Sequence, residues 1–189
     1  MKPALSVILT LRNHEPVVVN MVRGAVTVAA SVADEGGFEV LALDERSGDN
    51  TLSHLSVLHG QIPQLRTLQD LAPGSAIRRA AEVARGSCWV ILDRPVEGSL
   101  IEWATSMVVG DRPAAIVPGE VLAVEAEIGR GCLRQLRGGL VSAQRAVERA
   151  VRARGQRPAW SPAPDRGLAE RAMLFMRHHL GLLDRPLKA

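Results

Sequence analysis

The stretch LDERSGDNT, residues 43–51, follows the apolar run FEVLA at residues 38–42. Such a run is typical of a strand buried on both faces of a parallel sheet. The charged turn stands where this strand ends, and in open α/β sheets ligands bind beyond the carboxyl ends of the strands. The stretch is therefore either a surface turn or the edge of a binding site, and the rest of the sequence bears on the choice.

Strand-like and helix-like patterns alternate along the chain. Four short apolar runs are typical of buried strands: residues 5–11, 38–43, 64–68 and 88–93. Each is followed by a segment whose apolar residues recur at helical spacing. One or two more strands are expected within 114–128, followed by a mostly helical segment up to residue 155. This order predicts a three-layer α/β/α fold with a mostly parallel central sheet and right-handed crossovers.

The sequence divides near residue 155. Residues 1–155 hold the predicted strands, so we expect them to form one domain. The segment QRPAWSPAPDRG, residues 156–167, is rich in proline and polar residues, which favours a linker or an irregular strand. Within 156–189, residues 168–183 predict an amphipathic helix. We expect it to pack on the domain or on a second copy, as a homodimer, with a peripheral membrane contact as the alternative.

Composition narrows the classes of partner. The chain has 189 residues and a net charge of +3, but residues 121–189 carry 13 basic and 6 acidic side chains. A solvated basic helix face is favoured over an anionic partner, and the aromatic content of 3% argues against stacking on single-stranded nucleic acid. The apolar run at residues 4–11 is too short to span a bilayer. The two cysteines are isolated in the sequence, which together with the short apolar run predicts a cytoplasmic protein. From the low aromatic content we expect no nucleic-acid partner.

Three predicted strand ends carry polar residues. They are RNHE at 12–15, DERS at 44–47 and DRP at 93–95. Parallel strands bring these ends to one edge of the sheet, where they would line a cleft with carboxylates and guanidinium groups. A carboxylate there can accept hydrogen bonds from a nucleobase or ribose, or hold a divalent cation on a diphosphate. The alternative is structural: Asp44 caps its turn and Asp93 caps the next helix.

The order and spacing of these stretches resemble the family 2 glycosyltransferases of the GT-A fold. That family has VSVVIPVYNEE, VDDGSTDGT and GxxxARNxGxxxARGxxxxFLDAD, where this chain has LSVILTLRNHE, LDERSGDNT and GSAIRRAAEVARGSCWVILDRP. The second stretch aligns without a gap and matches at Asp44, Ser47, Asp49 and Thr51. Covering residues 5–103, the resemblance implies a glycosyltransferase that moves a sugar from a nucleotide-diphosphate-sugar to an acceptor.

The resemblance also implies site residues. Asp44 matches the carboxylate that receives the nucleobase, and Asp93 matches the first Asp of the DxD metal motif, a ligand of Mg²⁺ or Mn²⁺. Thr10, Arg12 and Asn13 line the same mouth, and Arg46 lies in the matching turn. Arg94, together with Arg78 or Arg79 on the predicted helix after Gly74, would face the diphosphate.

Departures from the family pattern weaken the metal site. Pro95 stands at the second Asp of DxD and offers no ligand. A site with one carboxylate can still hold Mg²⁺ when water and phosphate complete the shell, and Arg94 is a second source of positive charge. Arg46 replaces the glycine of the tight turn, which implies an altered backbone or a new side-chain contact.

The catalytic base is not selected by spacing. The candidates are Glu120, Glu125 and Glu127. Glu125 and Glu127 share a strand face if the segment is extended, although charges there are more typical of an edge strand that avoids pairing. Two functions follow: an active glycosyltransferase, or an inactive GT-A-like pseudoenzyme that serves as an interaction or regulatory module.

Overall fold

The computed structural model describes residues 3–33 and 37–161. In this part of the chain seven strands form one sheet, in the order β3-β2-β1-β4-β6-β5-β7. Their bounds are β1 (Leu5–Leu11), β2 (Phe38–Asp44), β3 (Leu65–Leu68), β4 (Cys88–Leu92), β5 (Ala114–Val117), β6 (Val121–Glu125) and β7 (Ala159–Trp160). β6 runs antiparallel to β4 and β5, and the other neighbouring pairs are parallel.

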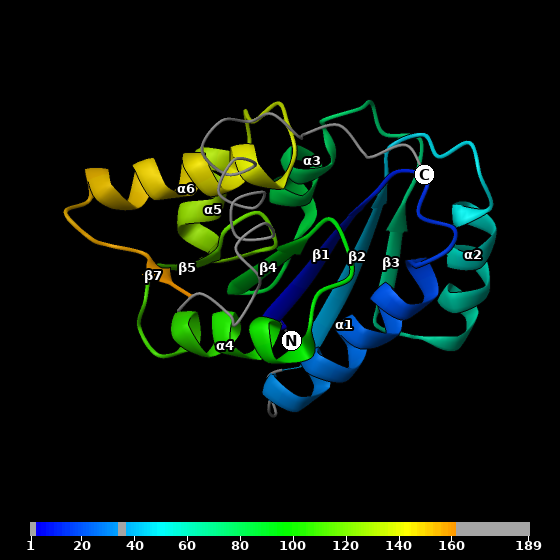
Figure 1. Ribbon diagram of the computed structural model, residues 1–189, viewed down its shortest axis with the longest axis horizontal. Helices are drawn as coiled ribbons and strands as arrows, with labels where there is room; N and C mark the ends of the chain where they lie inside the picture. The colour runs from blue at the N-terminus through cyan, green and yellow to red at the C-terminus, as the bar shows by residue number, and fades with distance from the viewer. Residues whose placement is uncertain (1–2, 34–36, 162–189) are drawn as a thin grey trace, which may run out of the picture.

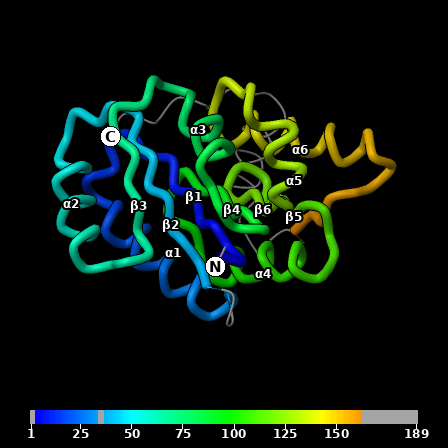
Figure 2. Tube along the Cα trace, turned by 180° about the vertical axis from the view of Figure 1, so that it is seen from behind, coloured from blue at the N-terminus to red at the C-terminus, as the bar shows by residue number. Residues whose placement is uncertain are grey.

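Helices cover both faces of this sheet. One face packs against α1 (Val18–Val32), α2 (Thr51–Gln61) and α4 (Gly98–Val109), and the other against α3 (Ala76–Val83), α5 (Ala126–Leu133) and α6 (Leu140–Ala153). Figures 1 and 2 show the two layers from opposite sides. Successive β1 residues alternate between two apolar clusters, with Val7 in the α1 layer and Ile8 in the α3 layer. The predicted three-layer α/β/α fold is confirmed.

Strand direction decides which residues reach the site. The pairs Leu11↔Asp44 and Leu43↔Leu68 bring the ends of β1, β2 and β3 to one edge of the sheet, at the upper right in Figure 1. β4 ends at the same edge because Leu92 pairs with Leu9. We call this the carboxyl edge and the opposite one the amino edge. The antiparallel β6 starts at the carboxyl edge and ends at the amino edge.

The second half of the chain departs from the expected boundaries. Residues 114–128 form two strands and the start of α5, which begins at Ala126. Ala159 and Trp160 pair in parallel with β5, so the sheet extends beyond residue 155, into the segment where the sequence left a linker or an irregular strand open. The predicted helix at 168–183 lies outside the described residues, and with it the expected dimer or membrane contact. Within residues 3–33 and 37–161, no helix is long and apolar enough to cross a bilayer.

Candidate functional site

The loops after β1 and β2 are tied together at the carboxyl edge. The Asn13 backbone N–H donates to Ser47 Oγ at 2.9 Å, and the Gly48 N–H donates to Asn13 Oδ1 at 2.8 Å. Asn13 has φ of 55°, a left-handed conformation that asparagine tolerates better than most residues. We call residues 12–14, 44–47 and 93–94 the strand-end cluster.

His14 ties in the third strand end. Its Nε2 lies 3.0 Å from the backbone carbonyl oxygen of Asp93, and its Nδ1 lies 2.9 Å from the backbone nitrogen of Arg12. The Asp93 carbonyl can only accept, whereas Nδ1 lies close to both the Arg12 N–H and the Arg12 carbonyl oxygen, at 2.9 and 3.0 Å, so the role of each ring nitrogen follows the tautomer. In the sequence, His14 was part of the polar RNHE stretch after the first predicted strand, and the bridge between the β1 and β4 ends could not be predicted from it.

Asp44 is fully buried under the turn that it begins. Its carboxylate accepts from the Ser47 backbone N–H at 3.1 Å and from the Ser47 hydroxyl. This is the turn-capping role that the sequence left open. For Asp44 to receive a nucleobase, its carboxylate would have to turn outward. The role of Asp44 as the carboxylate that receives the nucleobase therefore stays a prediction.

The next two residues of the turn face α3 and the loop after β3. Glu45 accepts from the backbone N–H groups of Gly74 and Ala76, at 2.9 and 2.8 Å, and so places a negative charge at the α3 N-terminus. Arg46 keeps a left-handed φ of 55°, and its Nε donates to Asp70 Oδ1 at 2.9 Å. Arg46 thus makes a new side-chain contact while it retains the backbone shape that glycine would favour.

Asp93 is the residue matched to the metal motif. Its side chain is 18% exposed, and Arg94 Nε donates to its Oδ1 at 3.1 Å. Burial raises the pKa of Asp93, while the charge and hydrogen bond of Arg94 oppose that rise. No group of three His, Cys, Asp or Glu side chains suited to a metal occurs within the described residues. One carboxylate, paired with a guanidinium group and followed by Pro95, does not fit a divalent cation.

Other predicted residues frame the cluster. Thr10 is half-buried, with its hydroxyl 3.5 Å from the Leu92 carbonyl oxygen across the β1–β4 pair. Arg78 is exposed near the start of α3, whereas Arg79 pairs with Glu82 at 2.6 Å along the same helix. Arg78 is therefore the better placed of the two to meet an anion.

The three candidate bases fall at opposite edges. Glu120 stands in the β5–β6 turn at the carboxyl edge and is 6% exposed. Glu125 lies opposite Cys88 in the β4–β6 register at the amino edge. Glu127 lies in the first turn of α5, with its Oε1 3.5 Å from Arg154 Nη2. The extended segment on which Glu125 and Glu127 would share a strand face does not occur, because α5 begins between them. Both lie away from the strand-end cluster because β6 is antiparallel.

Gln144 holds the turn that carries Glu120. From α6, its Nε2 donates to the carbonyl oxygens of Val117 and Val121, at 2.8 and 2.9 Å. Its Oε1 accepts from the Gly119 N–H at 3.0 Å. In the sequence, the available signal was a glutamine within an otherwise apolar helix face. Its hydrogen-bond partners lie more than twenty residues away and were not predictable.

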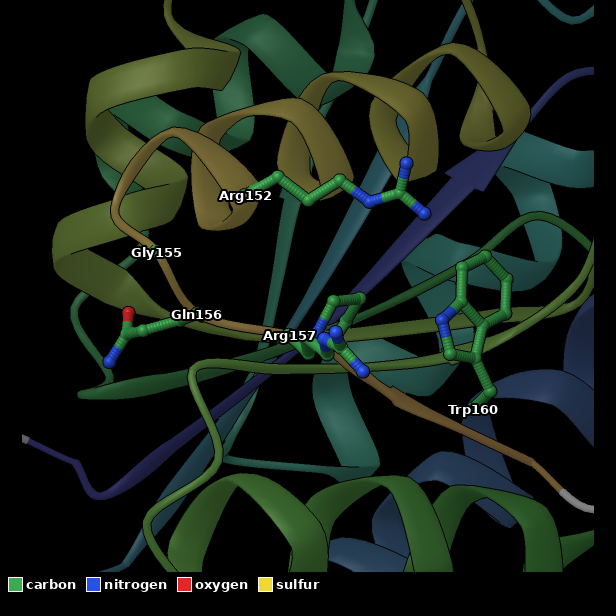
Figure 3. A pocket seen from close by; sticks show the side chains of 6 residues that line it. Arg152, Gly155, Gln156, Arg157 and Trp160 are labelled. Carbon is green, nitrogen blue, oxygen red and sulfur yellow. The ribbon is translucent and has the colours of Figure 1, made fainter.

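A cavity of about 580 Å³ lies elsewhere, between the end of α6 and β7. It is lined by Arg152, Gly155, Gln156, Arg157, Pro158 and Trp160 (Figure 3). None of these belongs to the residues predicted from the sequence. β5, β6 and β4 separate β7 from β1 in the sheet, so this cavity is distinct from the strand-end cluster.

Comparison with solved structures identifies the fold. The mannosyltransferase PcManGT from Pyrobaculum calidifontis, in complex with GDP-Man and Mn²⁺, has a TM-score of 0.68 at 17% identity, over 100% of this chain and 66% of that one. Glucosyl-3-phosphoglycerate synthase from Mycobacterium tuberculosis, with Mn²⁺ and UDP, gives 0.61 at 13%, over 96% and 79%. S. aureus TarS 1-349 with UDP gives 0.57 at 14%, over 79% and 55%.

These likenesses establish a GT-A glycosyltransferase-like fold, and at such identities they establish the fold alone. The chain spans about two thirds of the mannosyltransferase and about half of the TarS fragment. No family model and no curated protein matches the chain.

Proposed function

We propose that this chain binds a nucleotide-diphosphate-sugar at its strand-end cluster and is a glycosyltransferase-like domain of family 2 type with a degenerate DxD motif. The observation that supports this is the linkage of three strand ends, through Asn13 and His14, into one surface. Ligands of open α/β sheets bind at this position. The solved structures of the same fold are glycosyltransferases, two of them with nucleotides and Mn²⁺.

Glu120 is the candidate base within this proposal. It lies at the carboxyl edge in a turn that Gln144 fixes, and positioning within reach of the reacting group is the first requirement of a general base. In the proposed reaction, the acceptor oxygen forms a bond to the anomeric carbon, the bond from that carbon to the diphosphate breaks, Glu120 takes the proton of the acceptor hydroxyl, and the nucleoside diphosphate leaves. The Glu120→Gln variant should bind nucleotide like the wild type and lose sugar transfer.

An inactive pseudoenzyme is the second candidate. It is favoured by the burial of Asp44 against its own turn and by Pro95, which removes one metal ligand. Such a module would keep the fold and would bind a partner protein, with or without a nucleotide. It would not transfer a sugar from a donor. The two candidates differ in the release of nucleoside diphosphate from a nucleotide-sugar.

Isothermal titration calorimetry with UDP, GDP and their sugars tests the proposal. We expect one of them to bind, and Asn13→Gly to weaken that binding. Glycine suits φ of 55° at this position, so the variant removes the Gly48 contact without backbone strain. Arg149→Ala on α6 is the matched surface control. Release of nucleoside diphosphate from the bound donor supports the enzyme, and failure of every ligand to bind contradicts the proposal.

A further inference from the structure

Asp93, the residue matched to the metal motif, is already paired with the guanidinium group of Arg94. Arg94 Nε lies 3.1 Å from Asp93 Oδ1, so a metal at Asp93 would have to share the carboxylate with a paired cation. It would find one carboxylate there, because Pro95 offers no side-chain ligand. Mg²⁺ and Mn²⁺ depend on oxygen ligands. Asp93 is better suited to hold Arg94 than to hold a metal.

A second guanidinium group belongs to the same surface. The His14 ring contacts the Arg12 backbone nitrogen on one side and the Asp93 carbonyl oxygen on the other, at 2.9 and 3.0 Å. The backbones that carry Arg12 and Arg94 are thus one imidazole ring apart. Arg12 is exposed, and the Arg94 side chain is 43% exposed. Both side chains can therefore reach a ligand above the edge.

Two neighbouring arginines form ion pairs with residues outside the strand-end cluster. Arg46 is paired with Asp70 over the loop after β3, and Arg79 is paired with Glu82 on α3. Arg12 and Arg94 are the two arginines of the cluster that flank the bridging His14. Arginine stays protonated at physiological pH, and its planar fork matches two oxygens of a phosphate.

We propose that the strand-end cluster binds the diphosphate of a nucleotide-sugar without a divalent cation, with the guanidinium groups of Arg12 and Arg94 supplying the positive charge. This inference rests on the proposed function and specifies its ligand as the metal-free nucleoside diphosphate. Asp93 acts as a positioning residue that orients Arg94. The proposal separates this chain from the Mn²⁺-bound structures that share its fold.

Calorimetry on the wild-type chain gives the first test. UDP and GDP are titrated once with EDTA and once with Mn²⁺. We expect the affinity of the nucleotide that binds to differ by less than about threefold between the two conditions, which corresponds to about 0.7 kcal/mol. Binding that requires Mn²⁺ overturns this inference and leaves the proposed function standing. Absence of binding in both conditions overturns the proposed function, and this inference falls with it.

Variants then assign the positive charge. Arg94→Ala and Arg12→Ala should each weaken nucleotide binding by about tenfold or more in EDTA, since each removes a charge-assisted hydrogen bond. Arg149→Ala should leave it unchanged. If Arg94→Ala does not fold, the double variant Asp93→Asn with Arg94→Gln removes both charges together. Unchanged affinity in the folded Arg12 and Arg94 variants overturns the proposal.

A gain-of-function variant tests the same point from the other side. Arg94→Ala combined with Pro95→Asp supplies a second carboxylate and removes the competing cation. We expect Mn²⁺ to raise the nucleotide affinity of this double variant by about tenfold while it leaves the wild type unaffected. If Mn²⁺ raises the affinity of the wild type as much as that of the variant, the proposal is overturned.

Discussion

Strands β1 and β2 carry a polar network at each end, and the two networks differ in burial. At the amino edge, Glu39 Oε1 accepts from the Ser6 hydroxyl at 2.7 Å and from the Arg85 N–H at 2.6 Å, and its Oε2 accepts from Arg66. Ser6 and Glu39 are both buried. At the carboxyl edge, Arg12 is exposed and Arg94 is partly so.

The difference separates structural polarity from binding capacity. The amino-edge network is closed, because the Gly86 N–H donates to Ser6 Oγ at 2.8 Å and backbone groups meet the carboxylate that Arg66 also holds. A ligand would have to break these bonds, and each unmade bond in a buried site carries a large penalty. At the carboxyl edge, backbone groups of the loops are hydrogen-bonded to the side chains of Asn13, His14 and Ser47. The guanidinium groups of Arg12 and Arg94 stay at the surface, where an anion can bind them.

Removal of Glu39 should have the largest effect. Glu39→Ala leaves the Arg66 charge and the Ser6 hydroxyl without their acceptor, and we expect a loss of about 3 kcal/mol in the free energy of unfolding. Urea denaturation followed by fluorescence of the buried Trp89 measures it. Nucleotide affinity should not change at temperatures where the variant is folded. Weakened binding without a loss of stability would contradict the division between the two edges.

A pair of glycines tests the same contrast. A Cβ on Gly86 would lie 2.5 Å from the Ser6 backbone nitrogen, whereas a Cβ on Gly48 at the carboxyl edge would meet nothing within 4 Å. We expect Gly86→Ala to lower the free energy of unfolding by about 2 kcal/mol, because strand β1 cannot yield without losing its pairing. Gly48→Ala should be within about 0.5 kcal/mol of the wild type. Thermal or urea unfolding of both variants compares them, and equal costs would refute the packing difference.

The sequence could predict the edge at which the cluster forms, but not the state of its side chains. Alternating apolar runs imply parallel strands, and parallel strands bring the residues after Leu11, Leu43 and Leu92 together. The burial of Asp44 depends on how Ser47 folds back over it. Local pattern carries no such information, because an exposed and a buried Asp at a strand end look alike.

The failures in the second half have a different cause. Glu125 was one of three base candidates because its segment follows the DxD-like motif in the sequence. The short Pro118-Gly119 turn reverses the chain, so β6 runs antiparallel and moves Glu125 to the amino edge. In the first half, the contact of Glu39 with Arg66 likewise arises from registers set between neighbouring strands. Strand direction and register are tertiary properties, and composition does not determine them.

Asp49 gives a smaller effect that depends on pH. Its carboxylate accepts from the Thr51 hydroxyl at 2.6 Å and the Glu15 N–H at 3.0 Å. Burial acts to raise the pKa of Asp49, but these hydrogen bonds outweigh it and lower the pKa. The stabilisation is therefore present above the unfolded pKa and lost as pH falls through the lower folded value.

We expect Asp49→Ala to cost about 1 kcal/mol at pH 7, because it removes the hydrogen bonds that Asp49 accepts from Thr51 and Glu15. The difference from the wild type should shrink once the pH falls below about 4, the pKa of an unperturbed Asp. Urea unfolding at a series of pH values from 7 downward measures it. A difference that stays constant across the series would mean that the carboxylate charge contributes nothing.

The smallest effect should come from the exposed ion pair that mirrors Glu39–Arg66. Arg46 and Asp70 lie 2.9 Å apart, with side chains 60% and 82% exposed. Asp70 has φ of 57°, so Asp70→Asn is the appropriate variant, because asparagine tolerates this conformation and only the charge is lost. Solvent screens the pair, and we expect less than about 0.5 kcal/mol of change in the free energy of unfolding. A urea titration at low and high salt checks this, and a cost approaching that of Glu39→Ala would show that burial does not distinguish the two networks.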